Sequence, residues 1–334
     1  YTKVMELNYW ASTEAKSASY DEKTKDWTVV VERGGKEIVL KPKQLVLATG
    51  MSGRANLPKF KGMEKFKGDQ HHSSKHPGPD KYVGKKAVVI GSNNSAHDIC
   101  AALWEAGVDV TMVQRSSTHI VRSDTLMDIG LGSLYSEKAV QSGMTTAKAD
   151  LIFASVPYKI LHEFQIPLYD QMRERDGKFY DDLAKAGFML DWGDDNSGLF
   201  MKYLRRGSGY YIDIGASQLI IDGKIKLVGG QVEEITETGV KLDIGASDLI
   251  IDGSIKLKSG SDVEEITENS VILKDGTELP ADVIVYATGY GSMNGWAAEL
   301  ISQDVADKVG KCWGLGSGTT KDPGPWEGEQ RNMW

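Results

Sequence analysis

The feature that most constrains the fold is a run of four predicted elements. They are a strand, a glycine turn, a helix and a second strand. Ala87–Ile90 is wholly apolar, as expected for a strand buried on both faces. The turn at Gly91–Asn94 leads into a helix predicted over residues 95–106, which Gly107 ends. Val108–Val113 is the second predicted strand. A β-turn-α-β unit of about 30 residues builds a parallel sheet, so the predicted fold class is α/β.

The same turn has the pattern of a phosphate site. A glycine turn that opens a helix leaves main-chain N–H groups unpaired beside the positive end of the helix dipole. The segment reads GSNNSA, against the dinucleotide pattern G-x-G-x-x-G/A, with Asn93 in place of the middle glycine. Asn tolerates unusual backbone angles better than most residues, so the turn can persist. The residues expected to bind the cofactor here are Gly91, Ser92, Asn93, Asn94, Ser95 and Ala96.

The end of the second strand distinguishes between two cofactors. An NAD site usually has an acidic residue there for the ribose hydroxyl, whereas an NADP site usually has an arginine for the 2′-phosphate. Here the chain reads VTMVQRSST, so Arg115 and Ser116 stand at the tip and no acid does. A guanidinium offers a planar fork to a phosphate, and the serine adds a donor. NADPH is the favoured cofactor, and a solvated surface arginine is the alternative.

Residues 8–49 predict short strands joined by polar turns. Trp27–Val31 and Glu37–Leu40 flank a hairpin turn at Gly34-Gly35. Gln44–Ala48 is apolar and is predicted to be a buried strand that ends at Thr49-Gly50.

Three further stretches complete the outline of the chain. Residues 51–86 are predicted to be a linker, because no periodicity is sustained there. Residues 124–206 are predicted to be a mainly helical insert, either with a small core of its own or serving as a lid that faces the substrate. From residue 207 the pattern returns to short strands, of which Val283–Tyr286 is the last.

A tandem repeat lies among these later strands. DIGASQLIIDGKIKL at residues 213–227 returns as DIGASDLIIDGSIKL at residues 243–257, and VEEITE follows both copies. A solenoid needs at least about three copies, so two copies do not predict one. A recent duplication or a fault in the recorded sequence explains the near identity better than a functional role.

Charge and cysteine content exclude several classes of function. The net charge of -8 argues against nucleic acid as the main partner, although a local phosphate site is still compatible with it. The two cysteines, Cys100 and Cys312, exclude a disulfide framework and favour a reducing cytoplasm. No apolar run approaches the roughly 18 residues of a membrane span. His71, His72, His76 and His97 lie close in sequence, but no cysteine pair or HExxH spacing accompanies them, so no metal site is predicted.

With these residues identified, the chain resembles the flavin-containing monooxygenases, which are flavoproteins with two dinucleotide-binding domains. Four landmarks occur in the order typical of that family. They are the Ala48-Thr49-Gly50 segment, the Phe66-x-Gly68-x-x-x-His72 fingerprint, the GSNNSA turn and the Ala287-Thr288-Gly289-Tyr290 segment. The family usually has an aromatic residue four positions after the fingerprint histidine, where this chain has His76. The subclass, whether heteroatom, Baeyer–Villiger or plant-auxin-type oxidation, therefore stays open.

The resemblance implies that NADPH reduces FAD and that the reduced flavin uses dioxygen to oxygenate a small organic substrate. It implies that His72 lies near the nicotinamide as a catalytic residue, with a linker histidine packed in a turn as the alternative. It further implies a cofactor-binding role for Gly50, Phe66, Gly68, Thr288 and Gly289. The oligomeric state and the substrate stay open.

The resemblance also implies a domain organisation. A Rossmann-like NADPH-binding domain is inserted in an incomplete FAD-binding domain that begins with a β-meander. Residues 1–58 end the first half of the FAD-binding domain, 59–287 form the NADPH-binding domain with the insert at 124–206 and the repeat at 213–273, and 288–334 begin the return.

The family's own G-x-G-x-x-G turn for FAD is not found before Ala48, so the chain is expected to be an internal fragment. A catalytically silent nucleotide-binding module without its flavin half is the main alternative. A relative of the pyridine nucleotide–disulfide reductases is a third possibility, but it would need a redox CxxC. Cys100 and Cys312 are too far apart in sequence to form one.

Overall fold

The computed structural model describes residues 1–50, 52–235, 240–243, 265–267, 270–272 and 282–310. The chain divides into two compact units, one comprising residues 1–54 with the segment from Tyr290 onward, and the other residues 55–289. Among the helices of the described ranges, none combines the length and the apolar character that crossing a bilayer requires.

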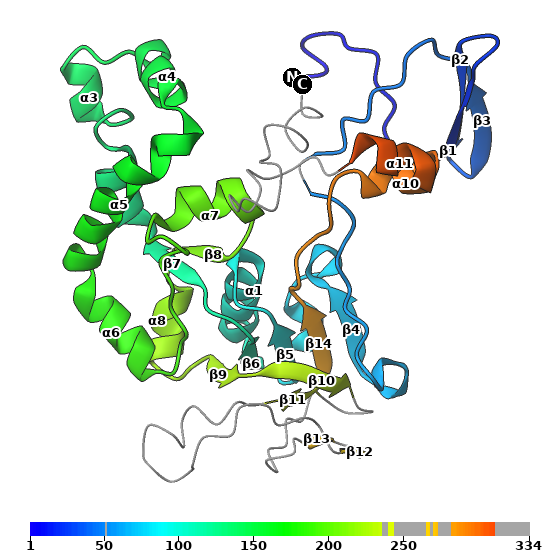
Figure 1. Ribbon diagram of the computed structural model, residues 1–334. Helices are drawn as coiled ribbons and strands as arrows, with labels where there is room; N and C mark the ends of the chain where they lie inside the picture. Colours follow the sequence, from blue (N-terminus) through cyan, green and yellow to red (C-terminus); the bar gives the residue numbers. More distant parts are fainter. Residues whose placement is uncertain (51, 236–239, 244–264, 268–269, 273–281, 311–334) are drawn as a thin grey trace. The chain divides into compact units, whose positions relative to one another are not determined.

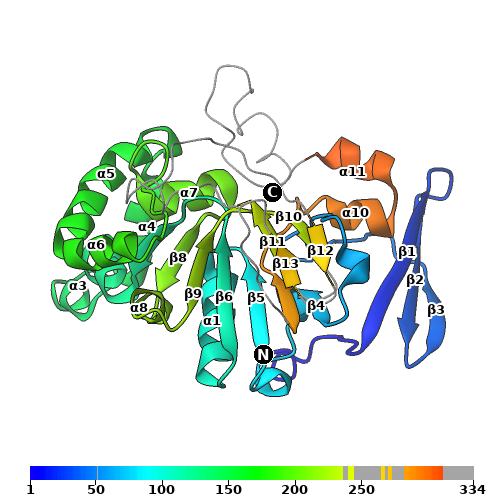
Figure 2. The same cartoon turned by 90° about the horizontal axis from the view of Figure 1, so that it is seen from below.

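A five-stranded, all-parallel sheet forms the centre of the unit at 55–289 (Figure 2). Its strand order is β4-β14-β5-β6-β9, so β14, the last of these strands in sequence, lies between the first two. This confirms the predicted α/β class and the strand that ends near Tyr286. The strands are β4 (Asp69–His72), β14 (Val283–Tyr286), β5 (Lys86–Ile90), β6 (Asp109–Gln114) and β9 (Lys226–Gly229).

Both faces of this sheet are covered, which explains why its central strands are apolar throughout. Ala87 and Val89 of β5 belong to the core that also contains Cys100 and Leu103 of helix α1 (Asn94–Glu105). The alternate residues of β5 point to a second core, which Phe66 shares. The predicted β-turn-α-β unit is confirmed, with the helix displaced by one residue.

The helical insert lies between two short parallel strands, β7 (His119–Arg122) and β8 (Tyr210–Asp213) (Figure 1). The prediction of a mainly helical stretch over 124–206 is confirmed. Its elements are α2 (Ser123–Thr125), a π-helical turn η4 (Leu126–Leu131), α3 (Glu137–Gln141), α4 (Thr146–Ser155), α5 (Tyr158–Arg175), α6 (Gly177–Lys185) and α7 (Gly198–Arg206).

The tandem repeat is described mainly in its first copy. That copy runs from the end of β8 through helix α8 (Ala216–Ile221) to β9, so the expectation of strands alone after residue 207 was wrong. Small and β-branched residues concealed a helix of only six residues, which is stabilised by packing rather than by propensity. Residues 244–257 of the second copy lie outside the described residues. Antiparallel pairs follow each copy: β10 (Gln231–Ile235) with β11 (Val240–Asp243), and β12 (Glu265–Thr267) with β13 (Ser270–Ile272).

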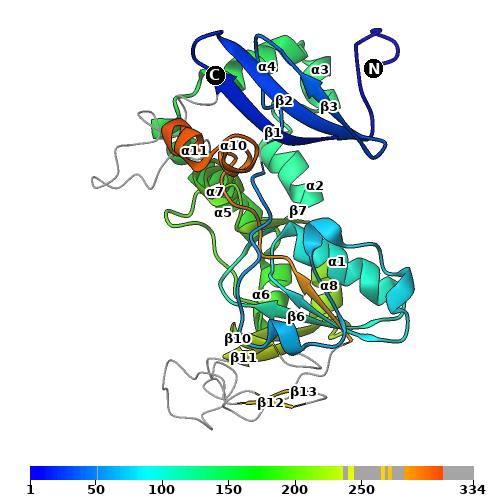
Figure 3. The same cartoon turned by 90° about the vertical axis from the view of Figure 1, so that its right-hand side faces the viewer.

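The other unit contains an antiparallel meander, β1 (Thr13–Asp21), β2 (Asp26–Arg33) and β3 (Lys36–Leu40) (Figure 3). Gly34 and Gly35 have φ of 58° and 74°, which is the left-handed backbone of the predicted hairpin turn. Helices α10 (Gly295–Leu300) and α11 (Gln303–Val309) follow one another in the later segment, and Leu300 packs against the apolar side of the meander.

Two sequence predictions around residue 50 were wrong. Residues 44–48 are not a strand, and Val46 is 81% exposed. A strand requires a hydrogen-bonded neighbour, and none of the described strands pairs with this segment. The predicted linker at 51–86 contains the edge strand β4 and three short 3₁₀ turns: η1 (Met63–Lys65), η2 (Ser73–Lys75) and η3 (Asp80–Tyr82). The sequence of β4, DQHH, concealed the strand because polar side chains suit an edge position.

Candidate nucleotide-binding site

Four neighbouring parallel strands bring most of the predicted site residues to one edge of the sheet. The carboxyl ends of parallel strands all lie at the same edge, and ligands of such sheets bind where the strand order reverses. Here the order reverses between β5 and β14, because β5 continues to β6 on one side and β14 returns on the other. The predicted residues at this edge are His72 on β4, Thr288 and Gly289 after β14, Gly91–Ala96 after β5, and Arg115 and Ser116 after β6.

Gly91 follows the last residue of β5 and is where the chain changes direction toward the site. Its N–H donates to the carbonyl oxygen of Val113 at 3.0 Å, and its φ of 132° is a backbone conformation that favours glycine. A Cβ at this position would overlap the carbonyl oxygen of Ala287, just after β14. Glycine is therefore required by backbone angle and by space together.

Helix α1 begins immediately after this turn. Asn93 is its N-cap, with an extended backbone, and its carbonyl oxygen accepts the N–H groups of Ala96 at 3.0 Å and His97 at 3.1 Å. The N–H groups of Asn94 and Ser95 precede these first helical bonds and belong to the amides that a helix start offers to an anion. Ser95 is exposed and Ala96 is buried, so Ser95 is the most exposed side chain of the turn.

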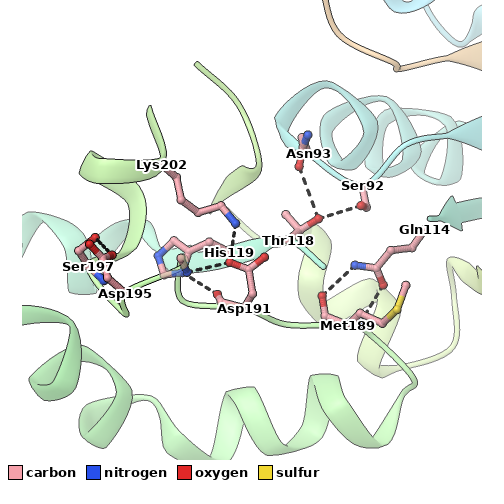
Figure 4. Close-up of polar contacts among 11 residues, drawn as sticks. Ser92, Asn93, Gln114, Thr118, His119, Met189, Asp191, Asp195, Ser197 and Lys202 are labelled. Carbon is pink, nitrogen blue, oxygen red and sulfur yellow. Dashed lines mark hydrogen bonds and ion pairs between the residues drawn. The ribbon is translucent and has the colours of Figure 1, made fainter. Parts of the chain in front are cut away.

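Several other side chains of the turn are directed into the protein. Ser92 and Thr118 form a hydrogen bond between their hydroxyls at 2.8 Å (Figure 4). Asn94 Oδ1 accepts the N–H of Ile212 at 3.1 Å, which fastens the turn to β8. An anion at this turn would therefore be held by main-chain donors and Ser95. Thr118 is a site residue that sequence reasoning missed, because it lies beyond the strand-tip pattern.

His97 closes the inner side of the turn. Its ring stacks on that of Tyr211 with centroids 4.0 Å apart, and its Nδ1 donates to the carbonyl oxygen of Asn93 at 3.1 Å. Burial lowers the pKa of His97 to about 4, so the ring is neutral at neutral pH.

The tip of β6 presents a buried glutamine followed by exposed residues. Gln114 is fully buried, and its amide pairs with the main chain of Met189, donating at 3.0 Å and accepting at 2.9 Å (Figure 4). Its side chain is therefore engaged within the protein at the position where an NAD site usually has an acid. Arg115 and Ser116, the next residues, are exposed at the predicted edge.

His72 links two neighbouring strand ends. Its Nδ1 accepts the N–H of Ser74 at 3.2 Å, so the ring proton lies on Nε2, which donates to the carbonyl oxygen of Gly289 at 2.9 Å. The same oxygen accepts the N–H of Asn56 at 2.9 Å. The imidazole is buried and holds the segment after β14; its catalytic role stays a prediction.

Phe66, Gly68 and Gly50 are not brought to this edge. Phe66 packs in the core beneath the sheet. Gly68 precedes β4 at the opposite end of the strands, where a Cβ would overlap the carbonyl oxygen of Asp282. Gly50 belongs to the other unit, and its φ of 82° favours glycine. Their roles in cofactor binding stay predictions.

A buried polar cluster that sequence reasoning missed lies next to Thr118. His119 is fully buried, its Nδ1 donates to the carbonyl oxygen of Asp191 at 3.0 Å, and burial lowers its pKa to about 4. Lys202 forms an ion pair with Asp191 (Figure 4). Burial opposes ionisation of Asp191, but Lys202 and the N–H of Gly193 keep its pKa below the usual value. Within the described ranges, no three or more His, Cys, Asp or Glu side chains gather as a metal site would require.

The chain matches known sequences over most of its length. The family model of pyridine nucleotide–disulphide oxidoreductases matches residues 11–166. The probable indole-3-pyruvate monooxygenase YUCCA10 of Arabidopsis thaliana is 25% identical over 295 residues, which cover 87% of this chain and 61% of that protein. Cyclohexanone 1,2-monooxygenase of Acinetobacter sp is 24% identical over 325 residues, which cover 92% and 55%. The chain thus spans little more than half the length of these relatives.

Solved structures share the fold. Cyclohexanone monooxygenase from Rhodococcus sp. Phi1 bound to NADP+ superposes with a TM-score of 0.54 at 17% identity, over 90% of this chain and 56% of that one. The OTEMO complex with FAD and NADP superposes with a TM-score of 0.56 at 17% identity, over 93% and 60%. The resemblance predicted from the sequence is confirmed: this chain is related to the flavoprotein monooxygenases and has their fold.

Proposed function

We propose that this chain is part of an NADPH- and FAD-dependent monooxygenase, and that residues 55–289 bind the NADPH. One observation carries the proposal. A required glycine, Gly91, opens helix α1 at the point where the strand order reverses, and Arg115 stands at the tip of the next strand. This is the arrangement by which parallel sheets bind a dinucleotide phosphate.

The residues at this edge fit NADPH. The main-chain N–H groups of Asn94 and Ser95 would hold the pyrophosphate, with the Ser95 hydroxyl beside them. Arg115 and Ser116 would hold the 2′-phosphate. Gln114 cannot serve the ribose hydroxyls as an acid would, because its amide is bound to Met189. These contacts favour NADPH over NADH.

The described residues around the meander provide no glycine turn that would bind FAD. In the described parts of the unit that contains residues 1–54, the strands form a meander and none leads through a glycine turn into a helix. No contact with FAD is therefore assigned to these residues. The bound cofactors supply the hydride transfer and the activation of dioxygen, while the protein orients and shields them.

The relatives support a monooxygenase over a catalytically silent module. Their names specify indole-3-pyruvate and cyclohexanone, which both carry a carbonyl group. We propose a small organic substrate that is oxidised at a carbonyl or at a nitrogen or sulfur atom, and a cytoplasmic location. The proposed domain organisation assigns residues 1–58 and 288–334 to the FAD-binding part and 59–287 to the NADPH-binding part.

The test is a pair of titrations on the purified 334-residue chain. Calorimetry with NADPH and with NADH should give tighter binding of NADPH. A visible spectrum taken before and after NADPH is added under air reports bound flavin. A flavin spectrum bleached by NADPH supports the complete proposal, whereas a colourless chain that binds NADPH supports the nucleotide site alone. Failure to bind either nucleotide contradicts the proposal.

A further inference from the structure

Asn93 is the N-cap residue of helix α1, but its side chain does not cap the helix. An asparagine at an N-cap normally accepts a hydrogen bond from the N–H of the second or third helical residue through its side-chain oxygen. In α1 those residues are Ser95 and Ala96, and the side chain of Asn93 makes no such bond. An asparagine that did cap the helix would occupy amides that a phosphate needs.

A hydrogen bond from Thr118 holds the Asn93 side chain away from the amides of α1. The Thr118 hydroxyl donates to Asn93 Oδ1 at 3.4 Å and lies 2.8 Å from the hydroxyl of Ser92 (Figure 4). Thr118 has one hydroxyl hydrogen, so Ser92 must be the donor in the second bond. Thr118 is 1% exposed, so in the chain Ser92–Thr118–Asn93 the Asn93 side-chain oxygen faces a buried hydroxyl instead of the amides of α1.

The main chain of Thr118 is itself fixed by the insert. Its N–H donates to the carbonyl oxygen of Met189 at 3.0 Å, and its carbonyl oxygen accepts the N–H of Asp191 at 3.3 Å. Gln114 holds Met189 from the other side. The hydroxyl that reaches Asn93 therefore comes from a backbone anchored on residues 189–191, where Leu190 forms an isolated β-bridge with Thr118.

On the basis of the NADPH site proposed above, we propose that Thr118 is a positioning residue. It compensates for the missing middle glycine of the nucleotide turn. That glycine normally allows the backbone to approach the pyrophosphate. Here the position carries a side chain, and Thr118 keeps it off the phosphate and off the amides of α1. Loss of the Thr118 hydroxyl frees Asn93 to cap its own helix in competition with the ligand.

The experiment is a double-mutant cycle with NADPH affinity as the readout. Thr118→Val should weaken NADPH binding by about fivefold to tenfold, as expected for competition by one N-cap hydrogen bond. Thr118→Ser retains the hydroxyl and should bind as the unmodified chain does. Asn93→Gly in the Thr118→Val background should restore the affinity to within about twofold, because a glycine has no side chain to compete and is tolerated at an N-cap.

The rescue separates positioning from a merely structural role. If Thr118→Val only loosened the turn, a second substitution to glycine would not restore binding. Equal affinity of Thr118→Val and the unmodified chain, or failure of Asn93→Gly to rescue, overturns the inference. NADH should weaken by the same factor, because both nucleotides share the pyrophosphate.

Asn93→Gly alone supplies a test that does not depend on the folding of Thr118→Val. With Thr118 in place, the Asn93 side chain is already withdrawn, so this variant should change NADPH affinity by less than about twofold. A large gain in affinity would show that Asn93 obstructs the phosphate despite Thr118, and would overturn the inference. Absence of NADPH binding by the unmodified chain would instead contradict the proposed function on which the inference rests.

Discussion

Nε2 of His72 and the carbonyl oxygen of Gly289 are joined by a 2.9 Å hydrogen bond between residues 217 positions apart in sequence. The bond connects the end of β4 to the segment that follows β14. Since Nδ1 accepts from Ser74, the imidazole is fixed in one tautomer and in one orientation.

His72→Ala should lower the free energy of unfolding by about 1–3 kcal/mol, because the Gly289 carbonyl oxygen loses one of its two partners and a buried ring leaves a gap. Urea denaturation followed by circular dichroism measures the change. Lys75→Ala, an exposed neighbour, serves as the control and should be close to neutral. Equal midpoints for the two variants would contradict a linking role for His72.

Arg115→Ala should weaken NADPH binding more than NADH binding, since only NADPH carries the 2′-phosphate. Loss of a charge-assisted contact corresponds to about 1.5–3 kcal/mol of binding free energy. Calorimetric titration of both nucleotides gives the ratio. Lys85→Ala removes an exposed cation just before β5, at the opposite edge of the sheet, and should leave the ratio unchanged. Equal losses for both nucleotides on Arg115→Ala would contradict the assignment.

Gly91→Ala should be strongly destabilising, because the new methyl group meets the carbonyl oxygen of Ala287 as well as an unfavourable φ. Overlap and strain of this kind each cost roughly 1–3 kcal/mol. Gly84→Ala is the matched control, with a φ of 74° and open space around the added carbon, so it isolates the cost of the backbone angle. Thermal unfolding should show Gly91→Ala as the less stable variant, and the reverse order would argue against the close approach.

Stability should fall as the pH drops below about 6.5, the ordinary pKa of histidine. Burial lowers the folded-state pKa of His97 and of His119 to about 4, so between these values the unfolded chain binds more protons than the folded chain. The free energy of unfolding therefore rises with pH across this window and is constant above it as far as these groups are concerned.

By pH 5 the loss should be about 2 kcal/mol for each of the two histidines. Urea titrations at neutral pH and near pH 5 measure the change. His97→Phe keeps the stacked ring but cannot titrate, so its loss over the same interval should be smaller. An identical loss in this variant would show that His97 does not contribute to the pH dependence.

The central β-turn-α-β unit could be predicted because its local signals agree. The apolar strand, the glycine turn and the helical spacing around Cys100 and Leu103 all indicate the same arrangement. Burial of the sheet on both faces stabilises that arrangement. The placement of Arg115 beside the turn followed from the unit itself, since adjacent parallel strands end at one edge.

What could not be predicted depends on partners distant in sequence. Gln44–Ala48 has the composition of a buried strand but forms none, because none of the described strands pairs with it, whereas the polar β4 is a strand because β14 pairs with it. The withdrawal of Asn93 by Thr118 likewise requires a tertiary contact that no local pattern encodes. A hydroxyl four residues beyond the end of β6 looks like any surface threonine until the fold is known.

The position of β14 between β4 and β5 has a consequence for how the protein is made. On the ribosome, β4, β5, β6 and β9 all emerge before Val283–Tyr286 is synthesised, and β4 and β5 do not pair with each other. Until that strand is synthesised, the edge of the apolar strand β5 has unpaired main-chain N–H and C=O groups. Such an edge is a target for chaperones or for aggregation. The yield of folded protein should therefore depend on how quickly the later segment is translated.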